Sequence, residues 1–194
     1  MPGRKCHHYQ GRAERKNTEK PPALFDLTSL QREANRQLGF TAQQTLDYTQ
    51  ALYEKKLVTY PRTDSRYLTD DMAPLVPELV SVIQQSFQIQ ADVPAPVNAA
   101  QVINSKKVTD HHAIIPTGVY AQNLTDMERR VYDLIARRFI AVFYPDCKIS
   151  TTTVMGEVDK IEFKVTGKQI LEPGWRVVFC QRCERYFRRK RGRG

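Results

Sequence analysis

The sequence predicts an α+β fold, in which a mainly helical domain is followed by part of a β domain. Residues 23–146 place apolar side chains at helical spacing, with hydroxyl residues positioned to begin the helices. From residue 147 onward the pattern moves towards alternation and becomes rich in Thr, Val and Ile. We therefore expect four segments: a basic, disordered lead-in over residues 1–22, a helical domain over 23–146, a partial β domain over 147–180 and a basic tail over 181–194.

The net charge of +9 is concentrated at the two ends of the chain. Residues 1–20 carry six Lys or Arg and two Glu, and residues 181–194 carry seven and one. We expect these tails to be solvated and to add non-specific affinity for phosphate, so specific chemistry must come from the nearly neutral stretch between them. No apolar run reaches the length of about 18 residues that a membrane helix needs, and no apolar signal segment opens the chain. The sequence thus predicts a cytoplasmic protein without membrane contact.

Two helices are predicted before residue 60. One runs through residues 27–38 and stops at Gly39, which can adopt a left-handed cap. The other runs through residues 42–57, where Thr41 and Gln44 have the spacing of a capping box. Its predicted buried face consists of Leu46, Gln50, Leu52, Tyr53 and Leu57.

Two more helices are predicted in the middle of the chain. Thr69 is expected to start a helix that continues through residues 77–87. Residues 91–98 form a linker interrupted by prolines, and Thr125 with Glu128 makes a further capping box. The buried face of the helix that follows is predicted to be Met127, Val131, Leu134, Ile135 and Phe139.

The predicted β domain consists of short strands separated by glycine turns. Residues 161–165 alternate between apolar and polar side chains, as a half-buried strand does. Turns are expected at Gly156 and Gly167. A last strand is predicted over residues 174–179.

The stretch YPRTDSRYL, residues 60–68, gathers a phenol, arginines and hydroxyl groups in one loop. Pro61 is expected to stop the preceding helix and to bias Tyr60 towards an extended backbone. In such a backbone Tyr60 and Arg62 share a face and could address one phosphate. A nearby cation favours the phenolate, and a guanidinium matches phosphate oxygens, so the pair suits attack on a phosphodiester. The alternative is a surface turn in which Tyr60 packs by its ring and the polar residues make local bonds.

A second cluster is TDHHAIIPT, residues 109–117, where two histidines follow an acid and precede a short apolar segment. Neighbouring side chains of a strand point to opposite faces, so either His111 or His112 could reach a phosphate while the other packs or faces solvent. The same divergence makes a shared metal site unfavourable. The alternative is one buried, hydrogen-bonded histidine and one exposed histidine.

Taken together, these stretches resemble the type IA DNA topoisomerases, and within them topoisomerase III most closely. The likeness covers about residues 23–179. It is carried, in the family's order, by LFDLTSLQREANRQLGF, KLVTYPRTDSRYL, TDHHAIIPT and the β segment FKVTGKQILEPGWRVVF. The resemblance implies that the helical domain is a DNA gate carrying the catalytic tyrosine.

The resemblance also implies a role for each candidate residue. Tyr60 matches the nucleophile that attacks a single DNA strand and leaves a 5′-phosphotyrosyl link with a free 3′-hydroxyl. Arg62 matches the arginine that positions the scissile phosphate, and His111 matches a histidine that contacts phosphate near the break. The remaining residues expected to contact DNA are Thr63, Asp64, Ser65 and Arg66. Religation would need no ATP, and strand passage before closure would relax or decatenate DNA.

The family's Mg²⁺ site implies a further segment. In the family, a catalytic glutamate and a D-x-D motif belong to an N-terminal Toprim domain, and nothing in residues 1–22 resembles it. We therefore expect this chain to bind no metal itself, to work with the remainder of a topoisomerase chain, and to be nearly inactive alone. Cys180 and Cys183 supply only half of a tetrahedral zinc site.

Other classes of protein remain as alternatives. The chain could be a non-catalytic module that binds single-stranded DNA and retains the loop, or a helical interaction domain with no DNA chemistry. A tyrosine recombinase places its tyrosine after the arginine and histidine, whereas Tyr60 precedes His111. A replication-initiation nuclease needs His-x-His for its metal, and neither CHHY nor DHHA supplies that spacing.

Overall fold

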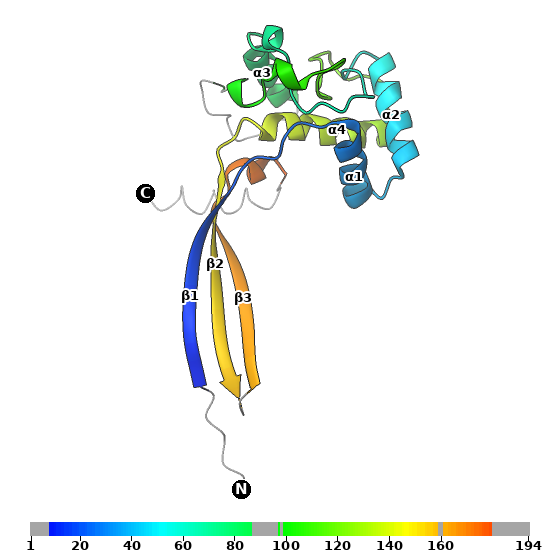
Figure 1. Cartoon of the computed structure of the whole chain (residues 1–194). Helices are drawn as coiled ribbons and strands as arrows, with labels where there is room; N and C mark the ends of the chain where they lie inside the picture. Colours follow the sequence, from blue (N-terminus) through cyan, green and yellow to red (C-terminus); the bar gives the residue numbers. More distant parts are fainter. Residues whose placement is uncertain (1–7, 87–96, 98, 159–160, 180–194) are drawn as a thin grey trace.

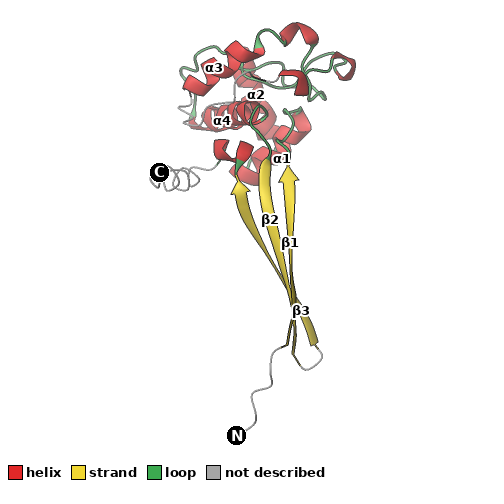
Figure 2. Cartoon of the chain, turned by 90° about the vertical axis from the view of Figure 1, so that its left-hand side faces the viewer, coloured by secondary structure: helices red, strands yellow, loops and turns green. Residues whose placement is uncertain are grey.

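The computed structural model describes residues 8–86, 97, 99–158 and 161–179. It combines a helical body with a long three-stranded sheet that projects from the body as an arm (Figure 1). The view turned by 90° shows the same separation, with the helices gathered at one end of the strands (Figure 2). The predicted α+β fold class is therefore confirmed.

The arm consists of β1 (His8–Glu19), β2 (Cys147–Val158) and β3 (Ile161–Glu172), antiparallel and in that spatial order. Strand β1 lies inside the segment predicted to be disordered, so that prediction is wrong for these residues. The polar sequence of β1 gives little strand signal by itself. It becomes a strand because β2 pairs with its backbone groups, starting from Glu19 opposite Cys147.

The two glycines predicted to form turns lie inside strands. The turns predicted at Gly156 and Gly167 are therefore wrong, since the first belongs to β2 and the second to β3. Gly156 lies opposite Phe163, and a Cβ on Gly156 would come within 2.7 Å of the Phe163 ring. Glycine is needed there to make room for an aromatic ring across the strands.

The strand predicted over residues 174–179 is instead a 3₁₀ helix, η4 (Gly174–Val178). Gly174 has a φ of 49°, and a Cβ there would lie 2.4 Å from two backbone carbonyl oxygens. This left-handed residue turns the chain away from an extended course at the base of the arm. Trp175 secures the turn, because its Nε1 donates to the Glu19 carbonyl oxygen at 3.1 Å.

The helical body contains α1 (Leu27–Leu38), α2 (Ala42–Glu54), η1 (Asp70–Met72), α3 (Val76–Ser86), η2 (Ala99–Gln101), η3 (Ser105–Lys107) and α4 (Asp126–Ala141). The predicted helix ends that rest on local hydrogen bonds are confirmed. Thr41 caps α2 and Thr125 caps α4, each in a complete capping box. Gly39 ends α1 in the left-handed conformation, with a φ of 73°.

Predictions that depended on longer-range features need correction. Thr69 precedes η1 rather than the longer helix, which begins at Val76. Helix α2 ends at Glu54, six residues before Tyr60, so Pro61 does not stop it. The predicted linker over residues 91–98 lies outside the described residues except for residue 97.

The predicted buried face of α2 is only partly confirmed: Leu52 and Leu57 are buried, but Leu46, Gln50 and Tyr53 are not. In the structure, the buried residues of α2 are Thr45, Thr49 and Leu52, whereas Tyr53 is 39% exposed. The Thr45 hydroxyl donates to the Thr41 carbonyl oxygen at 2.9 Å, and the Thr49 hydroxyl donates to the Thr45 carbonyl oxygen at 2.6 Å. Because these bonds satisfy both hydroxyls inside the helix, two polar side chains can be buried where an apolar stripe was expected.

Helix α4 takes part in two hydrophobic cores. Its first half packs with α1 and α2, and its second half packs with α3 and η4. Four residues of its predicted face are buried: Val131, Leu134, Ile135 and Phe139. The fifth, Met127, is 39% exposed in the first turn. The body therefore consists of two cores that share one helix.

An ion pair joins the start of α4 to the end of α2. Lys55 Nζ lies 2.8 and 2.9 Å from the two carboxylate oxygens of Glu128, which is buried. The same carboxylate accepts the backbone N–H of Thr125 at 2.7 Å. The hydrogen bond from Lys55, supported by those from Thr125, outweighs the effect of burial and holds the pKa of Glu128 below its usual value.

We expect Glu128→Gln to lower the free energy of unfolding by about 2 kcal/mol at pH 7, because it removes the charge that pairs with Lys55 at a largely buried position. A carboxyl group with a lowered folded-state pKa stabilises the fold above its ordinary pKa of 4.5, and that contribution is lost as the pH falls through the lowered value. Urea unfolding at pH 7 and at about pH 3 measures both effects. The two proteins should converge at the lower pH, and Glu54→Gln on exposed α2 surface serves as the control. A variant as stable as the wild type at pH 7 would contradict the assignment.

Candidate active site

Residues 60–66 form a stretch in which burial alternates from residue to residue. The buried members are Pro61, Thr63 and Ser65, and the exposed members are Arg62, Asp64 and Arg66. Buried and exposed side chains thus alternate with a period of two. Tyr60 is partly exposed and has the same parity as the exposed set. Because the backbone bends at residues 61 and 62, the shared face of Tyr60 and Arg62 stays a prediction.

The stretch is held by the second predicted cluster, through residues 111–117. Before Tyr60, the Thr59 N–H donates to the Ile115 carbonyl oxygen at 3.0 Å. After it, the Ala113 N–H donates to the Tyr67 carbonyl oxygen at 2.9 Å. The backbone that carries Tyr60 is therefore fixed on both sides by one segment from about 50 residues further along the chain.

Two hydroxyls of the stretch strengthen this attachment. The Thr63 hydroxyl donates to the His111 carbonyl oxygen at 2.7 Å. The Ser65 hydroxyl donates to the Lys107 carbonyl oxygen at 3.0 Å and accepts the Tyr67 N–H at 3.2 Å. Direct DNA contact, as predicted for both residues, does not fit this arrangement, because Thr63 and Ser65 are 7% and 4% exposed and point their hydroxyls at the protein. They position the loop instead.

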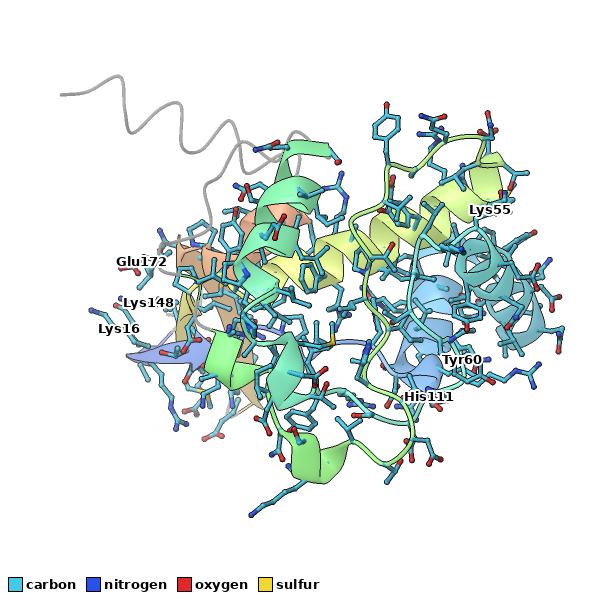
Figure 3. All side chains as sticks on the ribbon, turned by 90° about the horizontal axis from the view of Figure 1, so that it is seen from above. Lys16, Lys55, Tyr60, His111, Lys148 and Glu172 are labelled. Atoms are coloured by element: carbon cyan, nitrogen blue, oxygen red, sulfur yellow. The ribbon has the colours of Figure 1, made fainter. Side chains whose placement is uncertain are left out.

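The Tyr60 ring lies against two other rings. The His111 ring is tilted by 43° with its centroid 4.3 Å away, and Figure 3 shows the two side chains together. The Tyr53 ring of α2 meets Tyr60 edge to face, at 5.4 Å and 80°. Sequence reasoning brought Tyr60 and His111 to one site but missed Tyr53, which it assigned to the buried face of a helix.

Arg66 links the stretch to the start of α1. Its Nε donates to the Asp26 carboxylate at 2.7 Å, while Asp26 caps α1 by accepting the Ser29 N–H at 2.6 Å. Burial by itself would raise the pKa of Asp26, but the hydrogen bonds from Ser29 and Arg66 outweigh it and keep that pKa below its usual value. The Arg66 side chain remains 44% exposed, so it can also face a ligand.

The remaining predicted site residues are Arg62, Asp64 and the two histidines. Arg62 and Asp64 are exposed, and neither forms an ion pair with any residue that the structure describes. His112 turns away from its neighbour, with its Nδ1 2.9 Å from the Ala113 carbonyl oxygen. His111 is therefore the histidine of the pair that lies against Tyr60.

A metal site is not evident in this part of the molecule. Among the described residues, no three His, Cys, Asp or Glu side chains gather as metal ligands. The described residues of this site therefore supply no cluster of ligands for a metal ion. Cys180 and Cys183 lie outside the described residues.

The turn after α2 brings Tyr53 and Tyr60 together. The Lys56 N–H donates to the Tyr53 carbonyl oxygen at 2.8 Å, and the Leu57 N–H donates to the Leu52 carbonyl oxygen at 2.9 Å. This pair of bonds is a Schellman motif, which usually has glycine at the position of Lys56. Lys56 adopts the left-handed conformation there, with a φ of 59°. The chain therefore reverses within three residues and returns along the end of its own helix.

Comparison with known proteins identifies the family. A family model described as DNA topoisomerase matches residues 8–188. This chain belongs to the DNA topoisomerase family. Its curated relatives include DNA topoisomerase 3 of Bacillus subtilis, 41% identical over 177 residues, which cover 86% of this chain and 24% of the relative. DNA topoisomerase 3 of a Bacillus cereus strain is 42% identical over 171 residues, which cover 84% of this chain and 23% of the relative.

The fold agrees with this assignment. Full-length topoisomerase I from Thermotoga maritima has a similar structure, with a TM-score of 0.66 and 25% identity, over 89% of this chain and 29% of that one. The resemblance to type IA topoisomerases, and to topoisomerase III in particular, is confirmed. The chain spans about a quarter of the length of the curated relatives it matches. Within the described residues, no helix is long and apolar enough to cross a membrane.

We expect Lys56→Gly to raise the free energy of unfolding by about 1 kcal/mol, because glycine adopts the left-handed conformation without the steric cost that a Cβ brings. Urea unfolding measures the change. Lys56→Ala is the matched control: it removes the same charge but keeps the Cβ, so its stability should stay near that of the wild type. A glycine variant no more stable than the alanine variant would contradict the strain at this turn.

We expect Thr63→Val to lower the free energy of unfolding by about 1–2 kcal/mol, because the His111 carbonyl oxygen loses its donor and the Ser65 N–H loses its acceptor, while the side-chain volume is kept. Thr63→Ser retains the hydroxyl and should lose less. Thermal and urea unfolding of the three proteins compare them. If serine and valine cost the same, the hydrogen bond to His111 is not what stabilises this part of the loop.

Proposed function

We propose that this chain carries the nucleophile of a type IA DNA topoisomerase, which opens one DNA strand transiently and reseals it. The observation that supports this most is the placement of Tyr60. Its ring contacts those of Tyr53 and His111, on a stretch fixed at both ends, and Arg62 two residues later is exposed. A surface turn would need none of this support from a distant segment. Membership of the topoisomerase family points to DNA as the substrate.

The proposed first step is attack of the Tyr60 phenol oxygen on a phosphorus atom of single-stranded DNA. A phosphorus–oxygen bond forms to the phenol as the bond to the 3′ oxygen breaks, and the phenol proton is passed to the departing 3′ oxygen. The products are a 5′-phosphotyrosyl ester and a free 3′-hydroxyl, with no oxidation or reduction. Because the ester retains the bond energy, attack by that hydroxyl reverses the step without ATP. Another strand passes through the gap before closure.

The other site residues act on the phosphate or on the loop. Arg62 would place its guanidinium on the scissile phosphate and stabilise the charge of the transition state. His111, Asp64 and Arg66 are exposed and would contact the neighbouring DNA. Thr63 and Ser65 would keep the loop in place through the bonds described above.

We further propose that the complete reaction needs the remainder of a topoisomerase chain. The Mg²⁺ implied by the family would be bound there, by the Toprim domain, since the described residues offer no cluster for it. The 194-residue chain alone should therefore be nearly inactive. Its partners would be single-stranded DNA at the cleavage site and that remaining segment, in the cytoplasm of a bacterium at the nucleoid.

The function is tested by trapping a covalent adduct on a denaturing gel. A 3′-end-labelled single-stranded oligonucleotide is incubated with Mg²⁺ and the chain, with and without a Toprim-containing segment. We expect label on the protein only when that segment is present. Tyr60→Phe should abolish the adduct, and Arg62→Ala should reduce its rate about 100-fold, the usual cost of removing one preorganised donor.

Tyr120→Phe is the matched control, because this tyrosine is 72% exposed and outside the site. Its adduct should equal that of the wild type. Binding of the oligonucleotide without any adduct, by a chain shown to be folded, would favour a non-catalytic DNA-binding module. An adduct that survives Tyr60→Phe would show that another residue is the nucleophile.

A further inference from the structure

The proposed chemistry assigns no role to Tyr53, the third ring of the aromatic cluster. Tyr60 attacks, and His111 faces the DNA, but the Tyr53 ring also packs against Tyr60, edge to face at 5.4 Å and 80°. Edge-to-face pairs at this separation are attractive and favour one relative orientation of the two rings. Tyr53 thereby acts on the ring that carries the reacting oxygen.

Tyr53 comes from a different element than the other neighbour of Tyr60. It belongs to the last turn of α2, whereas His111 belongs to the segment that fixes the loop. The Schellman turn at Lys56 ties the Tyr53 backbone to the chain that leads to Tyr60. Two independent supports therefore meet at one ring: the helix end through Tyr53 and the distant segment through His111.

Burial indicates that Tyr53 does little for the core. Its side chain is 39% exposed, and the buried side of α2 is formed by Thr45, Thr49 and Leu52. Tyr53 belongs to neither hydrophobic core, and its ring contacts one neighbouring ring directly. That neighbour is Tyr60.

We infer that Tyr53 is a positioning residue for the Tyr60 nucleophile: its ring fixes the orientation of the Tyr60 ring from the end of α2. This inference rests on the proposed function. It requires the ring of Tyr53 and not its hydroxyl, so phenylalanine should replace it and leucine should not. Catalysis by a held nucleophile is sensitive to displacements of about 1 Å, so a freed ring reacts more slowly even when DNA binds normally.

The first measurement is the rate of adduct formation in a single turnover, with the Toprim-containing segment and saturating oligonucleotide. We expect Tyr53→Leu to be slowed about tenfold with an unchanged dissociation constant for DNA, and Tyr53→Phe to react at nearly the wild-type rate. Tyr120→Leu is the matched control for the substitution itself. Urea unfolding of each variant checks that all are equally folded.

The second measurement does not depend on activity. The 194-residue chain is labelled with 3-fluorotyrosine, and the Tyr60 signal among the nine tyrosines is identified by its loss in Tyr60→Phe. In the 19F NMR spectrum, Tyr53→Leu should move the Tyr60 signal, because the ring current of its neighbour is gone. Tyr53→Phe should leave it nearly in place, and Tyr120→Leu should not move it.

The outcomes separate this inference from the proposed function. An adduct in the wild type that forms equally fast in Tyr53→Leu, or a Tyr60 signal unmoved by that change, would overturn the positioning role alone. If the wild type forms no adduct under any condition, the proposed function is wrong. The role of Tyr53 in catalysis is then wrong too, even if the 19F shift confirms that its ring packs against Tyr60. A slowed Tyr53→Leu restored by Tyr53→Phe supports both.

Discussion

Hydrogen bonds between two distant stretches, residues 57–67 and 111–117, are the interaction on which the site depends. Neither stretch is a strand, and an isolated antiparallel bridge between Val58 and Pro116 joins them. Paired with each other, they satisfy backbone groups on both sides of Tyr60. The pairing also fixes which side chains face inwards, because neighbouring residues of an extended chain point in opposite directions.

Because of this alternation, one set of loop residues binds the protein and the other faces solvent. The inward hydroxyls of Thr63 and Ser65 bind protein carbonyl oxygens, and the outward charges of Arg62 and Arg66 remain accessible. A sequence of small hydroxyl residues between arginines thus has a structural explanation that complements its chemistry. Although every residue from 62 to 66 is polar, the hydroxyl residues face the protein and the arginines face solvent.

Features set by local hydrogen bonds could be predicted from the sequence. The capping boxes at Thr41 and Thr125 and the left-handed Gly39 involve residues within four positions of each other, so their spacing contains the whole signal. The grouping of Tyr60 with His111 came from a family resemblance, since about 50 residues separate the two positions.

Features that depend on distant partners could not be predicted in this way. Strand β1 has a polar sequence and exists because β2 pairs with it. Gly156 resembles a turn residue until Phe163 is seen across from it. By its spacing, Tyr53 belongs to the apolar face of a helix. It contacts Tyr60 because the chain turns at Lys56, and lysine is an unusual residue for a left-handed position.

Helix α4 connects the two hydrophobic cores. Since its first half belongs to the core beneath the Tyr60 loop and its second half to the core at the base of the arm, separating either core from its neighbours exposes part of the same helix. An opening of either core therefore leaves α4 with only half of its packing. The packing beneath the Tyr60 loop and the packing around η4 at the base of the arm are therefore connected through one helix.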